Sequence, residues 1–254
     1  KGVARVTCKR ARKGFNVKYN PDAHWNTALY RNLDFVQLST GENRVIINRD
    51  DQAGFRLDTT FTHNQRKSVS LESQPTLTTR TDFVNTYPSI IQTSSYLFME
   101  TETTPPTCVA VVKPHFVFNK NPAQHAADLH MLTRADDMRI NQPIECIRVD
   151  GASDEGPSHI EVQFQWAERH LQHKTQCTLV TTRHSGGSYL NRVELMNGCI
   201  AQAHANCFIP STLGGGNFNE NGLDEEKLRE NLDEACSVYM ERIWNALSIK
   251  KSSL

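Results

Sequence analysis

Three short acidic segments have the residue types and the order that two-metal phosphoryl-transfer chemistry uses. Asp50 and Asp51 end the run Arg-Val-Ile-Ile-Asn-Arg-Asp-Asp, Asp150 follows Glu-Cys-Ile-Arg-Val, and Glu194 lies within Asn-Arg-Val-Glu-Leu-Met-Asn. Two divalent ions held about 3.5–4 Å apart need a few convergent carboxylates on rigid elements. An acid that closes a strand is usually a solvated turn residue, so the segments are informative only together.

The acids follow or occupy patterns typical of regular elements. Residues 44–50 and 144–150 are apolar, β-branched runs that predict buried strands ending at Asp50 and Asp150. Glu194 lies on a predicted helix, about 100° around its axis from Val193 and at the edge of the buried face. That face is formed by Val193, Met196, Ile200 and Ala203.

Other segments complete an alternation of strands and helices. Strands are predicted at 55–61, 94–100, 108–118 and 177–182, and helices are predicted to begin at Pro122, Ile160 and Asp224. Asn121 is the expected N-cap of the first of these helices. The buried face of the second is predicted from the spacing of Ile160, Phe164, Ala167 and Leu171. The order predicts an α/β chain of the RNase H-like class: a mixed five-stranded sheet flanked by helices, with an extra C-terminal helix.

Composition divides the chain into three parts. Acidic and basic residues balance at 28 each, but residues 1–20 are basic and contain no acid. We therefore predict a basic N-terminal arm and lead-in over 1–43, a catalytic core over 44–210, and a Gly-rich linker with a C-terminal helix over 211–254. The arm is either a solvated leader or a contact to a nucleic-acid backbone through Lys9, Arg10, Arg12 and Lys13.

Neither a membrane nor an oxidising compartment is expected. The sequence has no apolar stretch long enough to span a bilayer. Its seven cysteines include no CxxC pair, which favours a reducing compartment. Cys199, His204 and Cys207 have a spacing that could meet zinc, although small buried residues on a helix explain the two cysteines as well.

Over residues 44–205 the chain resembles the DDE catalytic cores of cut-and-paste DNA transposases, and more distantly those of retroviral integrases. The resemblance lies in Asp50-Asp51-Gln-Ala-Gly, in Val-Asp150-Gly-Ala-Ser-Asp-Glu-Gly-Pro, and in Ser-Tyr-Leu-Asn-Arg-Val-Glu194. Two positions depart from it: Gln52 stands where Lys is common, and Arg192 where Pro often precedes the last acid.

The resemblance implies that Asp50, Asp150 and Glu194 are catalytic and hold two Mg²⁺ or Mn²⁺ ions. Asp51 is the alternate to Asp50, because neighbours on a strand face opposite sides and only one is expected in the site. The implied partner is double-stranded DNA, both transposon ends and target. A homo-oligomer is implied as well, since transposition pairs two DNA ends, and the nucleus is the expected compartment.

Several residues near the acids have two interpretations. Arg183 and Asn191 could contact DNA beside the third acid, or they could be ordinary polar loop residues. Asp154 and Glu155 are expected to face solvent or to cap a helix. Two other functions remain open: a domesticated, non-catalytic module of the same fold that binds DNA or protein, and a different RNase H-like nuclease.

Overall fold

A computed structural model of the chain describes residues 20–32, 44–52, 54–61, 68–70, 89–99, 105–134, 142–184, 187, 190–204 and 207–249. The predicted DNA-contacting residues Lys9, Arg10, Arg12 and Lys13 lie outside this part, so their role stays a prediction. The division at 43 and 210 also stays a prediction.

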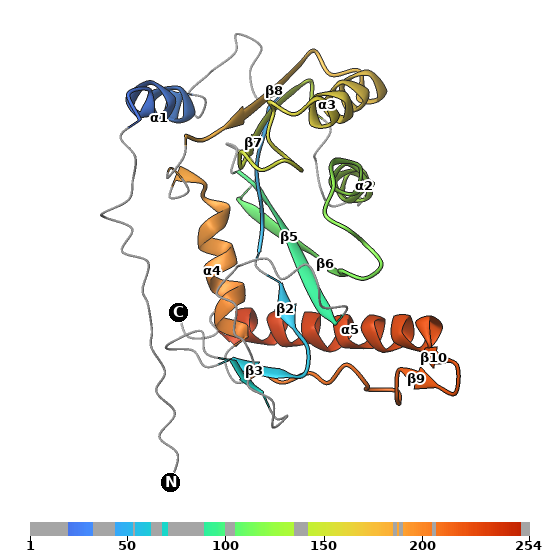
Figure 1. The fold of residues 1–254 in the computed structure, drawn as a ribbon. Helices are drawn as coiled ribbons and strands as arrows, with labels where there is room; N and C mark the ends of the chain where they lie inside the picture. Colours follow the sequence, from blue (N-terminus) through green and yellow to red (C-terminus); the bar gives the residue numbers. More distant parts are fainter. Residues whose placement is uncertain are drawn as a thin grey trace.

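A six-stranded mixed sheet forms the centre of the described structure (Figure 1). Its strands are β1 (Arg44–Asp51), β2 (Phe55–Arg56), β5 (Ile90–Phe98), β6 (Thr107–Pro114), β7 (Ile144–Val149) and β8 (Cys177–Thr182). The long strands lie in the order β6, β5, β1, β7, β8. β5 is antiparallel to β1 and β6, whereas β7 runs parallel to β1 and β8 parallel to β7. This order and these directions define the RNase H-like arrangement, so the predicted fold class is confirmed.

Helices cover both faces of the sheet (Figure 1). On one face lie α2 (Pro122–Thr133) and α3 (Ile160–His173), and on the other lie α4 (Val193–Ala203) and α5 (Glu225–Ile249). A further helix, α1 (Ala23–Asn32), contacts the end of β8 through the Asn26 side chain. None of the described helices combines the length and the apolar character that crossing a bilayer requires.

Residues of β1 alternate between these two helical layers. Ile47 belongs to an apolar cluster that includes residues of α2, whereas Ile46 belongs to a different cluster with Val193 of α4. Because side chains along a strand point alternately to opposite faces, the last two residues of β1 must also separate. Asp50 therefore faces the α4 side and Asp51 the α2 side, as the sequence predicts for neighbouring strand residues.

Several predicted elements are confirmed in detail. Asn121 is the N-cap of α2, and its side chain accepts a hydrogen bond from the Gln124 backbone N–H at 2.7 Å. The C-terminal helix packs on the core, as expected for an amphipathic helix. Its buried residues include Leu228, Leu232, Ala235 and Tyr239.

The predicted strand over 55–61 is wrong as a single element. It breaks at Asp58, whose φ of 61° is left-handed. The Asp58 carboxylate accepts a hydrogen bond from the Ser211 backbone N–H at 2.8 Å, which stabilises this turn. Only β2 joins the main sheet, while β3 (Thr59–Phe61) pairs with β4 (Ser68–Ser70). The second long strand is instead β5, which begins at Ile90, earlier than predicted.

The predicted buried face of α3 is also wrong, although the helix itself is present. The exposed side carries Ile160, Phe164 and Leu171, which are 78%, 68% and 74% exposed. The buried face carries Val162 and Arg169, and Arg169 forms an ion pair with Glu145 of β7 at 2.7 Å. A buried charged pair to the sheet therefore sets the rotation of α3, and spacing among apolar residues does not reveal such a pair.

His204 makes the stability of the fold dependent on pH. Its Nε2 atom is hydrogen-bonded to the Tyr239 hydroxyl of α5, and burial lowers its pKa to about 4. The unfolded chain, with a His pKa near 6.5, therefore binds the proton first as pH falls. We expect the free energy of unfolding to decrease between about pH 6.5 and pH 4, by up to roughly 3 kcal/mol.

Urea unfolding at pH 7.5 and at pH 5 measures this loss. His204→Gln keeps a polar partner for Tyr239 and cannot take up the proton, so this variant should lose less stability over the same range. An equally steep loss in both proteins would contradict the assignment.

Candidate metal centre

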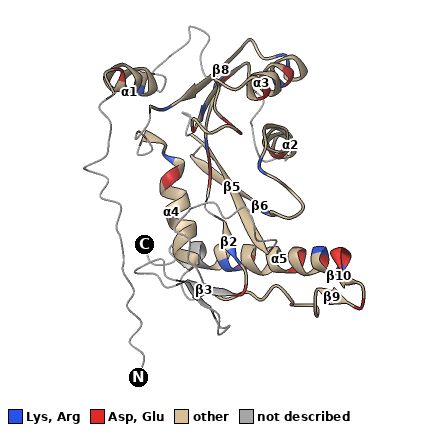
Figure 2. Cartoon of the chain, viewed as in Figure 1, with Lys and Arg blue, Asp and Glu red and all other residues tan. Residues whose placement is uncertain are grey.

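The three predicted acids come from three elements that meet at one edge of the sheet. Asp50 lies near the end of β1 and Asp150 directly follows β7. These strands are parallel neighbours, so their carboxyl ends lie together. Glu194 is in the acidic first turn of α4, which is visible in Figure 2. Burial of Val193 against the sheet fixes that turn beside Asp50.

A fourth carboxylate joins this group. Oxygen atoms of Asp50, Asp150 and Glu155 all lie within 4.8 Å of one another. Glu194 lies close enough to Asp50 for its charge to raise the pKa of Asp50. We call Asp50, Asp150, Glu155 and Glu194 the acidic site. Glu155 was expected to face solvent, but it is only 4% exposed.

A tight turn directs Glu155 inward. The Gly156 backbone N–H donates to the Ala152 carbonyl at 2.7 Å, closing the loop that follows Asp150. A Cβ atom at position 156 would lie 2.8 Å from that carbonyl oxygen, so glycine is required for this close approach. At the end of the turn Glu155 forms an ion pair with Arg49 of β1, in which Arg49 Nη1 lies 2.7 Å from Glu155 Oε2.

The acidic site carries more negative charge than the protein neutralises. Burial, followed by the charges of Glu194 and Glu155, raises the pKa of Asp50 to about 8. Arg183 acts in the opposite direction but does not cancel this effect. Asp50 holds its proton near neutral pH because it is buried and because other carboxylates lie beside it. A bound cation could take the place of that proton.

Arg183 touches two of the acids directly. Its Nη2 atom lies 3.1 Å from Asp150 Oδ2 and 3.7 Å from Glu194 Oε1. The residue is 9% exposed. In this arrangement its side chain faces the acids, and a contact of Arg183 to DNA stays a prediction.

Asn191 is also removed from the surface. It is 1% exposed, and its side-chain amide donates to the Arg49 backbone carbonyl at 3.0 Å. This bond ties the segment before α4 to β1. Asn191 therefore stabilises the position of the third acid, and its predicted DNA contact would need a different arrangement of this segment.

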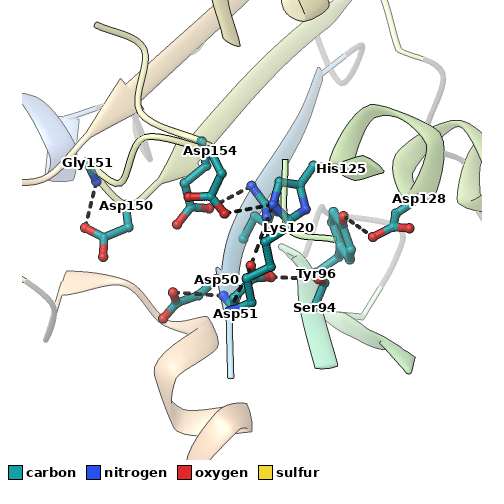
Figure 3. Close-up of polar contacts among 12 residues, drawn as sticks. Asp50, Asp51, Ser94, Tyr96, Lys120, His125, Asp128, Asp150, Gly151 and Asp154 are labelled. Atoms are coloured by element: carbon teal, nitrogen blue, oxygen red, sulfur yellow. Dashed lines mark hydrogen bonds and ion pairs between the residues drawn. The ribbon is translucent and has the colours of Figure 1, made fainter. Parts of the chain in front are cut away.

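A second cluster lies on the opposite face of β1 (Figure 3). Asp51, His125 and Asp154 bring their ligand atoms within 4.8 Å of one another. His125 Nε2 is 3.0 Å from Asp154 Oδ2. Asp154 was expected to face solvent or to cap a helix, so this contact was not predicted. Asp51 accepts a hydrogen bond from the Ser94 hydroxyl at 2.6 Å, and Lys120 Nζ lies 3.4 Å from its other oxygen.

The two clusters differ in how far the protein itself neutralises them. Burial alone would raise the pKa of Asp51, but Arg49, His125 and Lys120 outweigh it and lower that pKa below its ordinary value. The second cluster is thus already supplied with positive charge by Arg49 and Lys120, and a metal ion would have to compete with these two groups. The acidic site around Asp50 is the one whose donors fit Mg²⁺ or Mn²⁺, since both ions prefer carboxylate oxygens.

The sequence signals missed three features of the site: Glu155, the inward position of Arg183, and the Arg49 pair. A signal did exist for Arg49, because an arginine inside a buried strand run requires a carboxylate partner. Asp51 lies two residues further along the same strand, and Glu155 lies in the segment after Asp150. Arg49 contacts both carboxylates.

No family model matches the chain, and no curated protein matches its sequence. Among solved structures, the Mos1 transposase paired-end complex with left transposon end has a TM-score of 0.40 and 11% identity, covering 96% of this chain and 67% of that one. The Mos1 strand transfer complex has a TM-score of 0.39 and 11% identity, covering 97% of this chain and 65% of that one. The Mos1 mariner paired-end complex with Mn has a TM-score of 0.37 and 11% identity, covering 97% of this chain and 68% of that one. The chain spans about two thirds of the length of these structural neighbours, which are mariner transposase complexes.

Proposed function

We propose that this chain is the catalytic core of a DDE-type DNA transposase, or of a nuclease derived from one, and that it cleaves and joins DNA strands. The observation that supports this most strongly is the convergence of Asp50, Asp150 and Glu194 on an RNase H-like sheet edge. Those acids occupy the elements that the sequence resemblance implies. Burial, together with the charges of Glu194 and Glu155, raises the pKa of Asp50 to about 8, which is consistent with a place for a cation beside it.

In this proposal Asp50, Asp150 and Glu194 hold two Mg²⁺ or Mn²⁺ ions, and Glu155 lies within reach of the same position. Bound ions would activate water or a DNA 3′-hydroxyl and stabilise the leaving oxygen of the phosphodiester. Asp50 gives up its proton when the site loads. The attacking group is water or DNA, so no side chain of the protein has to form a covalent intermediate.

The partners follow from the same proposal. The substrate is double-stranded DNA, comprising transposon ends and a target, and the chromosomal location of such DNA makes the nucleus the working compartment. Joining two ends requires that two active sites be brought together, so the active form is a homo-oligomer.

Nicking of supercoiled plasmid in Mg²⁺ or Mn²⁺ tests the proposal. Asp150→Asn and Glu194→Gln remove charge but little volume, so each should reduce nicking at least about a hundredfold while leaving the melting temperature within a few degrees of wild type. Loss of folding in parallel with activity would argue against a catalytic role. Wild type as inert as its variants would favour the domesticated binding module.

A further inference from the structure

Arg183 is a positive group that lies inside the acidic site and contacts Asp150 and Glu194, whereas Arg49 pairs with Glu155. It directly follows β8, whose neighbour β7 leads into Asp150, so the fold holds the arginine and the acid at the same edge. One nitrogen, Nη2, contacts both Asp150 and Glu194, at 3.1 and 3.7 Å. Arg183 also lowers the pKa of Asp50, which means that its charge reaches all three predicted acids.

The second nitrogen of the guanidinium is not satisfied in this arrangement. Nη1 of Arg183 is buried and makes no hydrogen bond within the described part of the chain. A buried donor without a partner is destabilising, because it has lost its hydrogen bonds to water. Arg183 is therefore held in place by its attraction to the carboxylates, in a position that does not satisfy its own hydrogen-bonding groups.

A guanidinium and a divalent ion cannot both be close to the same carboxylate oxygens without repelling each other. At contact distances, the repulsion between such charges is large enough to change metal affinity by tenfold or more, even at an effective dielectric constant of about 20. We propose that Arg183 is a resident counter-cation, which neutralises Asp150 and Glu194 in the metal-free protein and must leave them when the site loads. This inference rests on the proposed metal site, and it adds that Arg183 sets the metal concentration at which loading occurs.

The test compares wild type with Arg183→Gln in two measurements. Mn²⁺ affinity is measured by calorimetry, and thermal unfolding is recorded in EDTA and in saturating Mn²⁺. We expect Arg183→Gln to bind Mn²⁺ about tenfold or more tightly than wild type, because a competing charge is gone. The variant should be less stable than wild type in EDTA, and this deficit should disappear or reverse in Mn²⁺.

Two further variants control for charge and for folding. Arg31→Gln removes the same charge from an exposed position on α1 and should leave both measurements near wild type. Arg183→Lys keeps the charge without the guanidinium fork, and an intermediate affinity is expected. This variant decides the question if Arg183→Gln does not fold.

The outcomes separate this inference from the proposed function. The role of Arg183 would be overturned, and the metal site left intact, by two results together. Wild type would bind Mn²⁺ tightly while Arg183→Gln binds it equally or more weakly, and Arg183→Gln would be destabilised by the same amount in EDTA and in Mn²⁺. Mn²⁺ binding by none of the proteins would overturn both.

Discussion

Asp50→Asn is expected to make the metal-free protein more stable, although it replaces a buried ionisable residue of the sheet. The pKa of Asp50 is raised to about 8, so ionising this group costs the folded state more than the unfolded chain. The wild type therefore loses stability as pH rises from about 4, the unfolded value, to about 8. Asparagine cannot ionise, so the advantage of the variant should be absent at pH 4 and reach roughly 2–5 kcal/mol at pH 9.

Urea unfolding in EDTA at pH 5 and pH 9 measures this effect. Asp51→Asn is the matched control, since the same substitution at the next residue should act in the opposite direction. Asp51 is bonded to Ser94 and lies beside Arg49 and Lys120, which lower its pKa, so its loss removes favourable interactions. Destabilisation by Asp50→Asn at pH 9 would show that Asp50 is a neutralised structural acid and would remove the argument for a cation there.

Arg49→Met should be the most destabilising single change near the site, at about 3–5 kcal/mol. Arg49 is 4% exposed and contacts Glu155 at 2.7 Å and Asp51 at 3.4 Å. Methionine fills a similar volume but leaves two buried carboxylates without this partner. Because the Arg49–Glu155 pair connects β1 to the loop after Asp150, the variant should also lose the geometry of the acidic site.

A double-mutant cycle with Glu155→Gln isolates the pair. The double variant should recover about 1–3 kcal/mol relative to the sum of the single effects, as contacting residues do. Additive effects would mean that the two side chains do not support each other and that another contact holds the loop. Urea unfolding in EDTA at pH 7.5 gives all four free energies.

Much of the scaffold was predictable because it depends on local patterns. The apolar runs before Asp50 and Asp150 form β1 and β7, and the spacing from Val193 identifies the buried face of α4. Strand alternation alone separates Asp50 from Asp51. These features follow from periodicity, which one sequence displays directly.

The parts that were not predictable depend on charged contacts between distant residues. The rotation of α3 follows from the Arg169–Glu145 pair, so its apolar residues at helical spacing face outward. The position of Glu155 follows from Arg49 and from the turn at Gly156. Neither partner can be assigned from spacing, because each lies on another element and is reached only through the tertiary fold.

The central claim is that the acids on the α4 side of β1 bind a divalent metal and that the cluster around Asp51 does not. Calorimetric titration of Mn²⁺ into wild type, Asp50→Asn and Asp51→Asn at pH 7.5 tests it most directly. We predict that wild type and Asp51→Asn bind Mn²⁺ and that Asp50→Asn binds at least about tenfold more weakly, since it lacks a ligand. Unchanged binding by Asp50→Asn together with lost binding by a folded Asp51→Asn would contradict it and move the metal site to the opposite face of the sheet.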